Sequence, residues 1–330
     1  MSGEIKKELY IAEPLLKGRL HIAYPMISFM QHPKGQLFLY NFFLNLECSK
    51  KEEDLNVCYV SQLNHSDISW IHYLNNHRCY LNFFDEESEG LHVDLQDEID
   101  QGNYIYLSFD DFYLPEKMRE PRHLEHINMI YGYDQKRRIY KTIGYNSEQT
   151  FGLMDLPFPA AEKGVVKTTV ETFSPDMGKE FSFSIQHFKM QLDDFIEGRN
   201  DLVSKEALAF DGICKENFVY GIKVYDRIAE SIEQLGEGRD YDRRTLYMLY
   251  EWSRLNYMRI QYLKERHVIN FNREIEDMAL LNYEEMRKGH YLMLKYSCTY
   301  DRRILPKILE ILRGHKARSI HLYTKMREAL

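Results

Sequence analysis

The sequence predicts an α+β N-terminal half followed by an α-helical bundle. Short aromatic and β-branched runs separated by polar turns occur in the first 160 residues, a pattern typical of strands. Beyond them, long segments carry apolar residues at three- and four-residue spacing, which is typical of packed helices. Because 330 residues exceed the usual size of a single hydrophobic core, we expect two domains, 1–160 and 161–330.

Three strands are expected near the middle of the first domain, over Asn103–Phe109, Ile127–Tyr133 and Arg138–Tyr145. The polar turn at residues 133–136 joins the last two, which predicts an antiparallel hairpin. We interpret the earlier apolar segment Leu37–Leu46 as a buried helix, although its length alone does not exclude a strand. The first domain is therefore expected to pair an antiparallel sheet with one long helix.

The domain boundary is expected near residue 160, where Pro157, Pro159 and Gly164 interrupt the pattern. Gly198 follows an amphipathic segment and predicts a helix end. Four further segments have helical periodicity and predict the bundle: 218–235, 242–266, 269–288 and 304–329.

Charge and composition exclude several classes of partner. The formal net charge of -8 would repel a phosphate backbone, so we expect no nucleic-acid partner. The first 20 residues carry charges throughout, unlike a signal peptide, and Leu37–Leu46 is too short to cross a bilayer. We therefore expect no membrane span. The five cysteines lack a CxxC pair and predict reduced thiols in the cytoplasm: Cys48, Cys58, Cys79, Cys214 and Cys298.

The most informative segment for chemistry is Asp110–Tyr145, because His126 stands at the head of a predicted strand. A sheet can hold a histidine rigidly at its edge, which is what proton transfer by a general base requires. A structural role for a single histidine at this position is the alternative. Motifs for dinucleotide binding, phosphate loops, zinc proteases and serine hydrolases are absent from the sequence.

The runs YIYLSFDDFYLP, residues 104–115, and HLEHINMIYGYD, residues 123–134, resemble the N-terminal domain of the butirosin biosynthesis protein H family. The resemblance covers roughly residues 15–160, and the helical remainder is similar to the regions that accompany such domains. It implies a papain-like fold and acyl transfer from a carrier-protein thioester to an amine in antibiotic assembly.

The resemblance also implies the parts of a papain-like site. His126 matches the family histidine, and Gln31 stands where the glutamine of the oxyanion hole is expected. Gln36 and Leu37 occupy the position of the nucleophilic cysteine, and neither can attack a thioester. Asn146 is the nearest substitute for the acid that orients the histidine. We expect four residues to bind substrate: Gln36, Tyr113, His123 and Tyr145.

Two displaced thiols and a metal site are the alternatives. Cys48 is expected to be a packing residue, whereas Cys79, close to His77, is a second candidate nucleophile. Several potential ligands fall in the first domain: His65, His72, His77, His123, His126, Asp110 and Asp111. His123 and His126 would point to opposite faces of one strand, and no ligand spacing is repeated. We therefore predict no metal and no cofactor.

Three functions follow from these features. The first is an accessory protein of nonribosomal peptide or polyketide antibiotic biosynthesis, with a degenerate papain-like cleft that binds acyl or peptidyl intermediates on a carrier protein, or a synthetase domain. The second is an active acyltransferase or thiol hydrolase in which His126 serves as the base. The third is a module that forms a homodimer through its helical domain.

Overall fold

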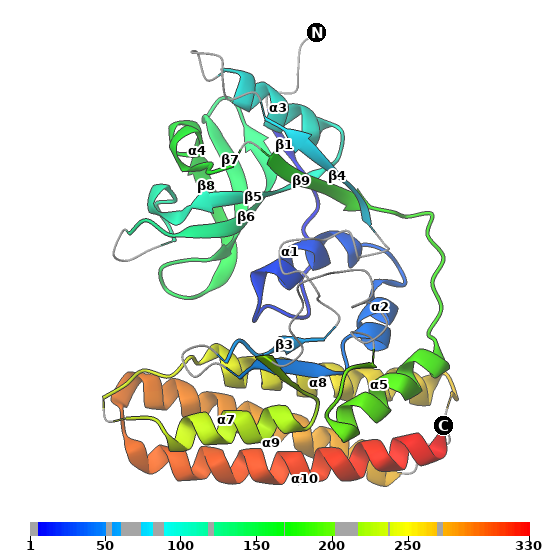
Figure 1. Ribbon diagram of the computed structural model, residues 1–330. Helices are drawn as coiled ribbons and strands as arrows, with labels where there is room; N and C mark the ends of the chain where they lie inside the picture. The colour runs from blue at the N-terminus through cyan, green and yellow to red at the C-terminus, as the bar shows by residue number, and fades with distance from the viewer. Residues whose placement is uncertain are drawn as a thin grey trace. The chain divides into compact units, whose positions relative to one another are not determined.

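The computed structural model describes residues 6–50, 55–60, 74–81, 89–117, 122–167, 169–201, 217–236, 238–268 and 273–330 (Figure 1). The chain forms two compact units. The first unit comprises residues 1–35 and 65–180, and the second comprises residues 36–64 and 181–330. None of the described helices combines enough length with enough apolar residues to cross a membrane.

An antiparallel sheet forms the first unit, and seven strands belong to it among the described residues. The strands are β1 (Lys6–Glu8), β4 (Leu74–Tyr80), β5 (Tyr104–Asp110), β6 (Glu125–Asp134), β7 (Ile139–Tyr145), β8 (Phe151–Pro157) and β9 (Thr169–Pro175). Their order is β4-β9-β5-β6-β7-β8, and β1 pairs with β6. The three strands expected from the sequence are confirmed, as is the antiparallel hairpin of β6 and β7.

Every second side chain of β5 points into the core of this unit. Ile105, Leu107 and Phe109 are almost fully buried, and they belong to the same apolar cluster as residues of helix α3 (Glu89–Asp100). The helix contributes Leu91, Leu95 and Ile99, at four-residue spacing. The core therefore fixes both the face of the sheet that α3 covers and the register of β5.

The first unit has short helices among its described residues, where the sequence predicts one long helix. Helix α1 (Leu20–Phe29) ends in a turn, and α4 (Phe158–Gly164) follows β8. The helix after that turn, α2 (Gly35–Phe42), belongs to the second unit apart from Gly35. Pro33 in the turn cannot continue a helix. Gly35 also has no space for a side chain, because an added Cβ would lie 2.5 Å from the carbonyl oxygen of Phe29.

The second unit combines long helices with a small sheet. Its strands are β2 (Leu46–Ser49), β3 (Cys58–Tyr59) and β10 (Phe218–Tyr220), in the order β10-β2-β3. The helices among its described residues are α2, α5 (Ile185–Glu197), α7 (Lys223–Glu233), α8 (Arg244–Glu265), α9 (Arg273–Thr299) and α10 (Leu305–Ala329), with a 3-10 turn η3 (Arg302–Ile304). Helix α9 packs against α8 and α10, as Figure 1 shows.

The helical predictions hold for most of this unit. Gly198 ends α5 in the left-handed conformation, with φ at 64°, as expected of a helix stop. The segment 218–235 differs, since it begins with the short strand β10 before α7 starts. Leu37–Leu46 is helical only as far as Phe42, and its last residue begins β2.

The compact units divide the chain elsewhere than at residue 160. Strand β9 lies beyond that point and pairs with both β4 and β5, so the sheet continues to residue 175. The residues from Gln36 to Asn64 belong with the helical unit. Local sequence patterns cannot reveal this, because both assignments depend on partners more than 60 residues away in the chain.

A fully buried arginine holds the end of α2 in the second unit. The Arg259 guanidinium of α8 donates to the carbonyl oxygens of Tyr40 at 2.6 Å, Phe43 at 2.8 Å and Leu39 at 3.3 Å. It also donates to the side-chain oxygen of Asn256. These acceptors are neutral, and burial lowers the pKa of Arg259 to about 10. The Leu39 carbonyl also accepts from the backbone N–H of Phe43 at 3.0 Å. Arg259 thereby supplies a partner for the carbonyls of Tyr40 and Phe43, which lie at and just beyond the end of α2, where a helix leaves carbonyls unpaired.

Replacing Arg259 with leucine should destabilise the protein by about 3 kcal/mol, because the buried carbonyl groups of Tyr40 and Phe43 would lose the arginine that they accept from. Chemical denaturation followed by circular dichroism measures this loss. The control is Arg266→Leu at the exposed end of the same helix, expected to change stability by no more than about 0.5 kcal/mol. Equal effects of the two substitutions would contradict the capping role.

The central strand β2 carries a buried carboxyl group. Glu47 is 9% exposed, and burial raises its pKa to about 8 from an ordinary value of 4.5. The folded protein therefore retains a proton that the unfolded chain releases between these two pH values. Stability contributed by the protonated group is fully present below pH 4.5 and is lost as pH rises toward 8.

The variant Glu47→Gln should be more stable than the wild type at pH 9, by an amount on the order of a few kcal/mol, because glutamine needs no proton to be neutral. At pH 5 the two proteins should differ much less. Thermal unfolding at both pH values provides the comparison. If the stability difference between the wild type and Glu47→Gln were the same at pH 5 and pH 9, the raised pKa of Glu47 would be contradicted.

Candidate functional site

A histidine and a buried aspartate form a pair at one end of the first unit's sheet. His126 lies near the start of β6, opposite Phe109 of β5. Asp111 follows β5 directly, in the 3-10 turn η1 (Asp111–Tyr113). The Asp111 carboxylate hydrogen-bonds the Nδ1 atom of His126. The two side chains differ sharply in exposure, 1% for Asp111 and 48% for His126, so a buried acid holds an accessible imidazole.

Two more side chains hold Asp111. Lys117 Nζ lies 2.8 Å from Asp111 Oδ1, and the side-chain amide of Asn128 donates to the same oxygen at 3.1 Å. Lys117 also donates to Asn128 Oδ1 at 2.7 Å. Burial alone would raise the pKa of Asp111, but the hydrogen bond from His126 and the charge of Lys117 outweigh it and lower that pKa. Asp111 is therefore a carboxylate at neutral pH.

The charge on Asp111 determines how the imidazole can act. A carboxylate only accepts hydrogen bonds, so Nδ1 of His126 carries the proton in their shared bond. Nε2 of a neutral ring then holds the lone pair. This is the arrangement of a general base that a second residue orients, with the developing positive charge of the ring stabilised by the acid behind it.

An aromatic cluster adjoins this pair. His123 Nδ1 lies 2.6 Å from Asp110 Oδ2, and the His123 ring stacks on Phe112 with 4.3 Å between centroids. Tyr113 meets the same histidine edge-on at 6.1 Å. The hydrogen bond with His123 lowers the pKa of Asp110. Two expected substrate-binding residues, His123 and Tyr113, are thus together beside the turn that carries Asp111.

The other predicted catalytic residues lie elsewhere. The Gln31 amide donates to the hydroxyl of Tyr104 at 2.7 Å. Tyr104 lies five residues along β5 from Phe109, or about 17 Å in an extended strand. Asn146 accepts from the backbone N–H groups of Glu148 and Thr150 at 3.0 and 2.9 Å, and so closes a turn. Asp111, not Asn146, contacts the His126 ring.

The remaining expected substrate-binding residues have other contacts. The Tyr145 hydroxyl donates to the carbonyl oxygen of Lys17 at 3.2 Å, and its ring packs against Phe151. Gln36 is exposed in the first turn of α2, where Leu37 is half-buried, and both belong to the second unit.

Sequence reasoning missed Asp111 as the partner of His126. The signal available was the pair Asp110-Asp111 directly after a predicted strand, together with His126 at the head of the next strand. Antiparallel pairing of consecutive strands brings the end of one beside the start of the other. The sequence does not show which of the two aspartates is buried, because that depends on Lys117 and Asn128.

Among the described cysteines, Cys79 belongs to the first unit, and Cys48, Cys58 and Cys298 belong to the second. Cys48 and Cys58 are buried in β2 and β3, and burial raises the pKa of Cys48 to about 12, which confirms its packing role. Cys79 lies on β4, three strands from β6, a separation of about 14 Å. Burial, together with a hydrogen bond to Glu98, raises the pKa of Cys79 to about 11, so it is a thiol at neutral pH. Three residues considered above lie outside the described residues: Cys214, His65 and His72.

Comparison with known proteins leaves the family open. A scan against protein-family models found no match to this chain, and a search of curated proteins found no significant match.

The variant Asp111→Asn should lose about 3 to 5 kcal/mol of stability, because it leaves the Lys117 ammonium buried without its anionic partner. The double variant Asp111→Asn/Lys117→Met should recover most of that loss. Urea denaturation measures both. Asp110→Asn, next in the chain, is the matched control and should cost less than about 1 kcal/mol. Equal losses in the single and double variants would contradict the buried ion pair.

The same pair predicts a pH dependence. Because the pKa of Asp111 is lowered in the folded state, its contribution to stability is present above the ordinary value of 3.8 and is lost as pH falls through the folded value. The difference in unfolding free energy between the wild type and Asp111→Asn should therefore narrow in acid, which urea denaturation at neutral and at acidic pH measures.

Proposed function

We propose that the first unit is an acyl-transfer centre in which His126 acts as the general base. The observation that carries this proposal is an accessible imidazole hydrogen-bonded to a buried, charge-compensated carboxylate.

The reaction can proceed without an enzyme nucleophile. An amine attacks the thioester carbonyl, and Nε2 of His126 takes the proton that the attacking nitrogen loses. The tetrahedral intermediate then expels the sulfur, which receives that proton from the imidazolium. A C–N bond forms, a C–S bond breaks, and the histidine returns to its neutral form. Proton transfer of this kind contributes about 10²- to 10⁴-fold to the rate.

The identity of the donor rests on the resemblance to the butirosin biosynthesis protein H family. Residues 104–115 and 123–134 carry that resemblance, and they also supply Asp111, His123 and His126. We infer a papain-like arrangement, an acyl or peptidyl chain on a carrier protein as donor, and a place in antibiotic assembly in the cytoplasm. The Phe112, Tyr113 and His123 rings would offer an apolar surface to the acyl chain.

An accessory role is the second candidate, and it is favoured by the lack of a cysteine nucleophile beside His126 among the described residues. Among the described cysteines none is paired with His126, and the position expected for the nucleophile holds Gln36 and Leu37. In this role the first unit would bind the carrier-tethered chain, or a synthetase domain, without turnover.

One assay separates the two roles. Acyl-loaded carrier protein is incubated with a panel of primary amines, and amide product is quantified alongside carrier binding. If the unit is catalytic, His126→Ala should lower the rate by about 100-fold or more and leave carrier binding unchanged. Asp111→Asn should also slow turnover, since it removes the carboxylate that orients the ring.

The control is His321→Ala, which removes an exposed histidine paired with Glu274 in the helical unit. It should leave the rate unchanged. Turnover that is insensitive to His126 would contradict the proposed base, whereas carrier binding without product would establish the accessory role.

A further inference from the structure

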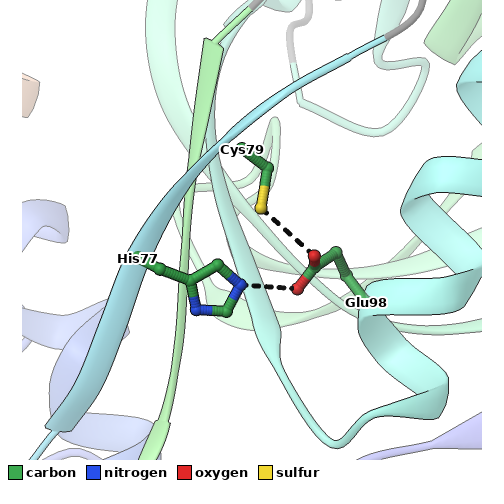
Figure 2. Close-up of side chains that lie close together, drawn as sticks. All are labelled: His77, Cys79 and Glu98. Atoms are coloured by element: carbon green, nitrogen blue, oxygen red, sulfur yellow. Dashed lines mark hydrogen bonds and ion pairs between the residues drawn. The ribbon is translucent and has the colours of Figure 1, made fainter.

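A second group of chemically active side chains lies on the edge strand of the same sheet. His77 and Cys79 are two residues apart on β4, so both point to one face of the strand. Glu98 reaches the same place from α3. Its Oε2 atom lies 3.2 Å from His77 Nε2, and its Oε1 atom lies 3.1 Å from Cys79 Sγ. Figure 2 shows one carboxylate oxygen of Glu98 facing the imidazole and the other facing the thiol.

The separations of these atoms suit a metal ion. One nitrogen, one sulfur and one carboxylate oxygen all lie within 4.8 Å of one another. In tetrahedral zinc, ligand bonds of about 2.0 to 2.3 Å place neighbouring ligand atoms about 3.3 to 3.8 Å apart. Small side-chain rotations would therefore suffice to enclose the ion, without movement of the backbone.

Neighbouring groups orient these side chains. The Asn103 amide donates to Glu98 Oε2 at 2.8 Å, and the hydroxyl of the buried Thr172 lies 2.8 Å from His77 Nε2. Nε2 thus faces two oxygens, although one ring nitrogen has only a single proton or lone pair to offer. A cation at this point would accept electron pairs from the imidazole and the carboxylate together.

We propose that His77, Cys79 and Glu98 bind one Zn²⁺ ion, with a fourth coordination position open to solvent. The mixture of nitrogen, sulfur and oxygen favours zinc over Mg²⁺ or Ca²⁺, which prefer oxygen alone. On binding, Cys79 releases its proton to solvent, and the resulting thiolate together with the carboxylate balances the two positive charges of the ion. The His77 side chain is 48% exposed, so water can complete the coordination.

This site is separate from the His126 centre. Strands β9 and β5 lie between β4 and β6 in the sheet. The ion would join the edge strand β4 to helix α3. Metal binding and acyl transfer can therefore be measured independently, and failure of one leaves the other intact.

The test is a titration of the full chain, purified free of metal, with ZnCl₂ in a calorimeter. We expect one Zn²⁺ per chain. Each of His77→Ala, Cys79→Ser and Glu98→Gln should weaken binding by about 100-fold or more, and Asn103→Ala, which only loosens Glu98, by about 10-fold. Cys298→Ser and His321→Ala are matched controls of an exposed thiol and an exposed histidine paired with Glu274, and both should bind as the wild type does. MgCl₂ should give no binding.

Cobalt provides a readout that does not depend on the stability of the variants. Co²⁺ bound to the wild-type protein should show a sulfur-to-metal charge-transfer band, and that band should be absent from Cys79→Ser. Circular dichroism of the metal-free variants checks that they are folded. Wild-type protein that binds no Zn²⁺, or a Cys79→Ser variant with unchanged affinity and spectrum, would overturn the proposal.

Discussion

A carboxylate sealed from water must be compensated by positive charge and hydrogen bonds, and in the first unit Asp111 imposes that requirement on everything around it. Lys117 supplies the positive charge, and Asn128 and His126 each supply a hydrogen bond. Three elements are thereby fixed to one another: the end of β5, the turn that follows it and the start of β6. The accessible imidazole is a consequence, since its orientation is set by an acid that cannot move toward solvent.

The second unit also contains a buried charged group, but there the charge is positive. Arg259 is buried among carbonyl groups and a side-chain amide, and its role is to satisfy the end of a helix. Trp252 adds a hydrogen bond from its indole nitrogen to the Leu44 carbonyl at 2.7 Å. The side-chain oxygen of Gln191 accepts a hydrogen bond from the backbone N–H of Leu44 at 3.2 Å. Side chains therefore hold the segment that joins α2 to β2, alongside two backbone bonds, from Phe43 N–H to the Leu39 carbonyl and from Val60 N–H to the Asn45 carbonyl.

Much of the secondary structure could be predicted from the sequence, for reasons that differ by element. The hairpin of β6 and β7 follows from local composition and a polar turn, and Gly198 ends α5 because glycine readily adopts a positive φ. Strand β9 escaped prediction, since its partners lie far away in the chain. At the candidate site, His126 could be selected from its position before a strand. Asp111 could not, because burial distinguishes it from Asp110 and no local pattern encodes burial.

The way the chain divides between its units affects the order in which the protein can fold during synthesis. Strand β2 pairs with β10, which lies about 170 residues further along the chain and is therefore synthesised much later. The segment 36–64 must therefore wait, with much of its apolar surface uncovered, until most of the chain has been made. Fragments that end near residue 180 would carry that segment without its helical partners and would be prone to associate with one another. Expression of the first unit alone calls for removal of the segment, not merely truncation of the chain.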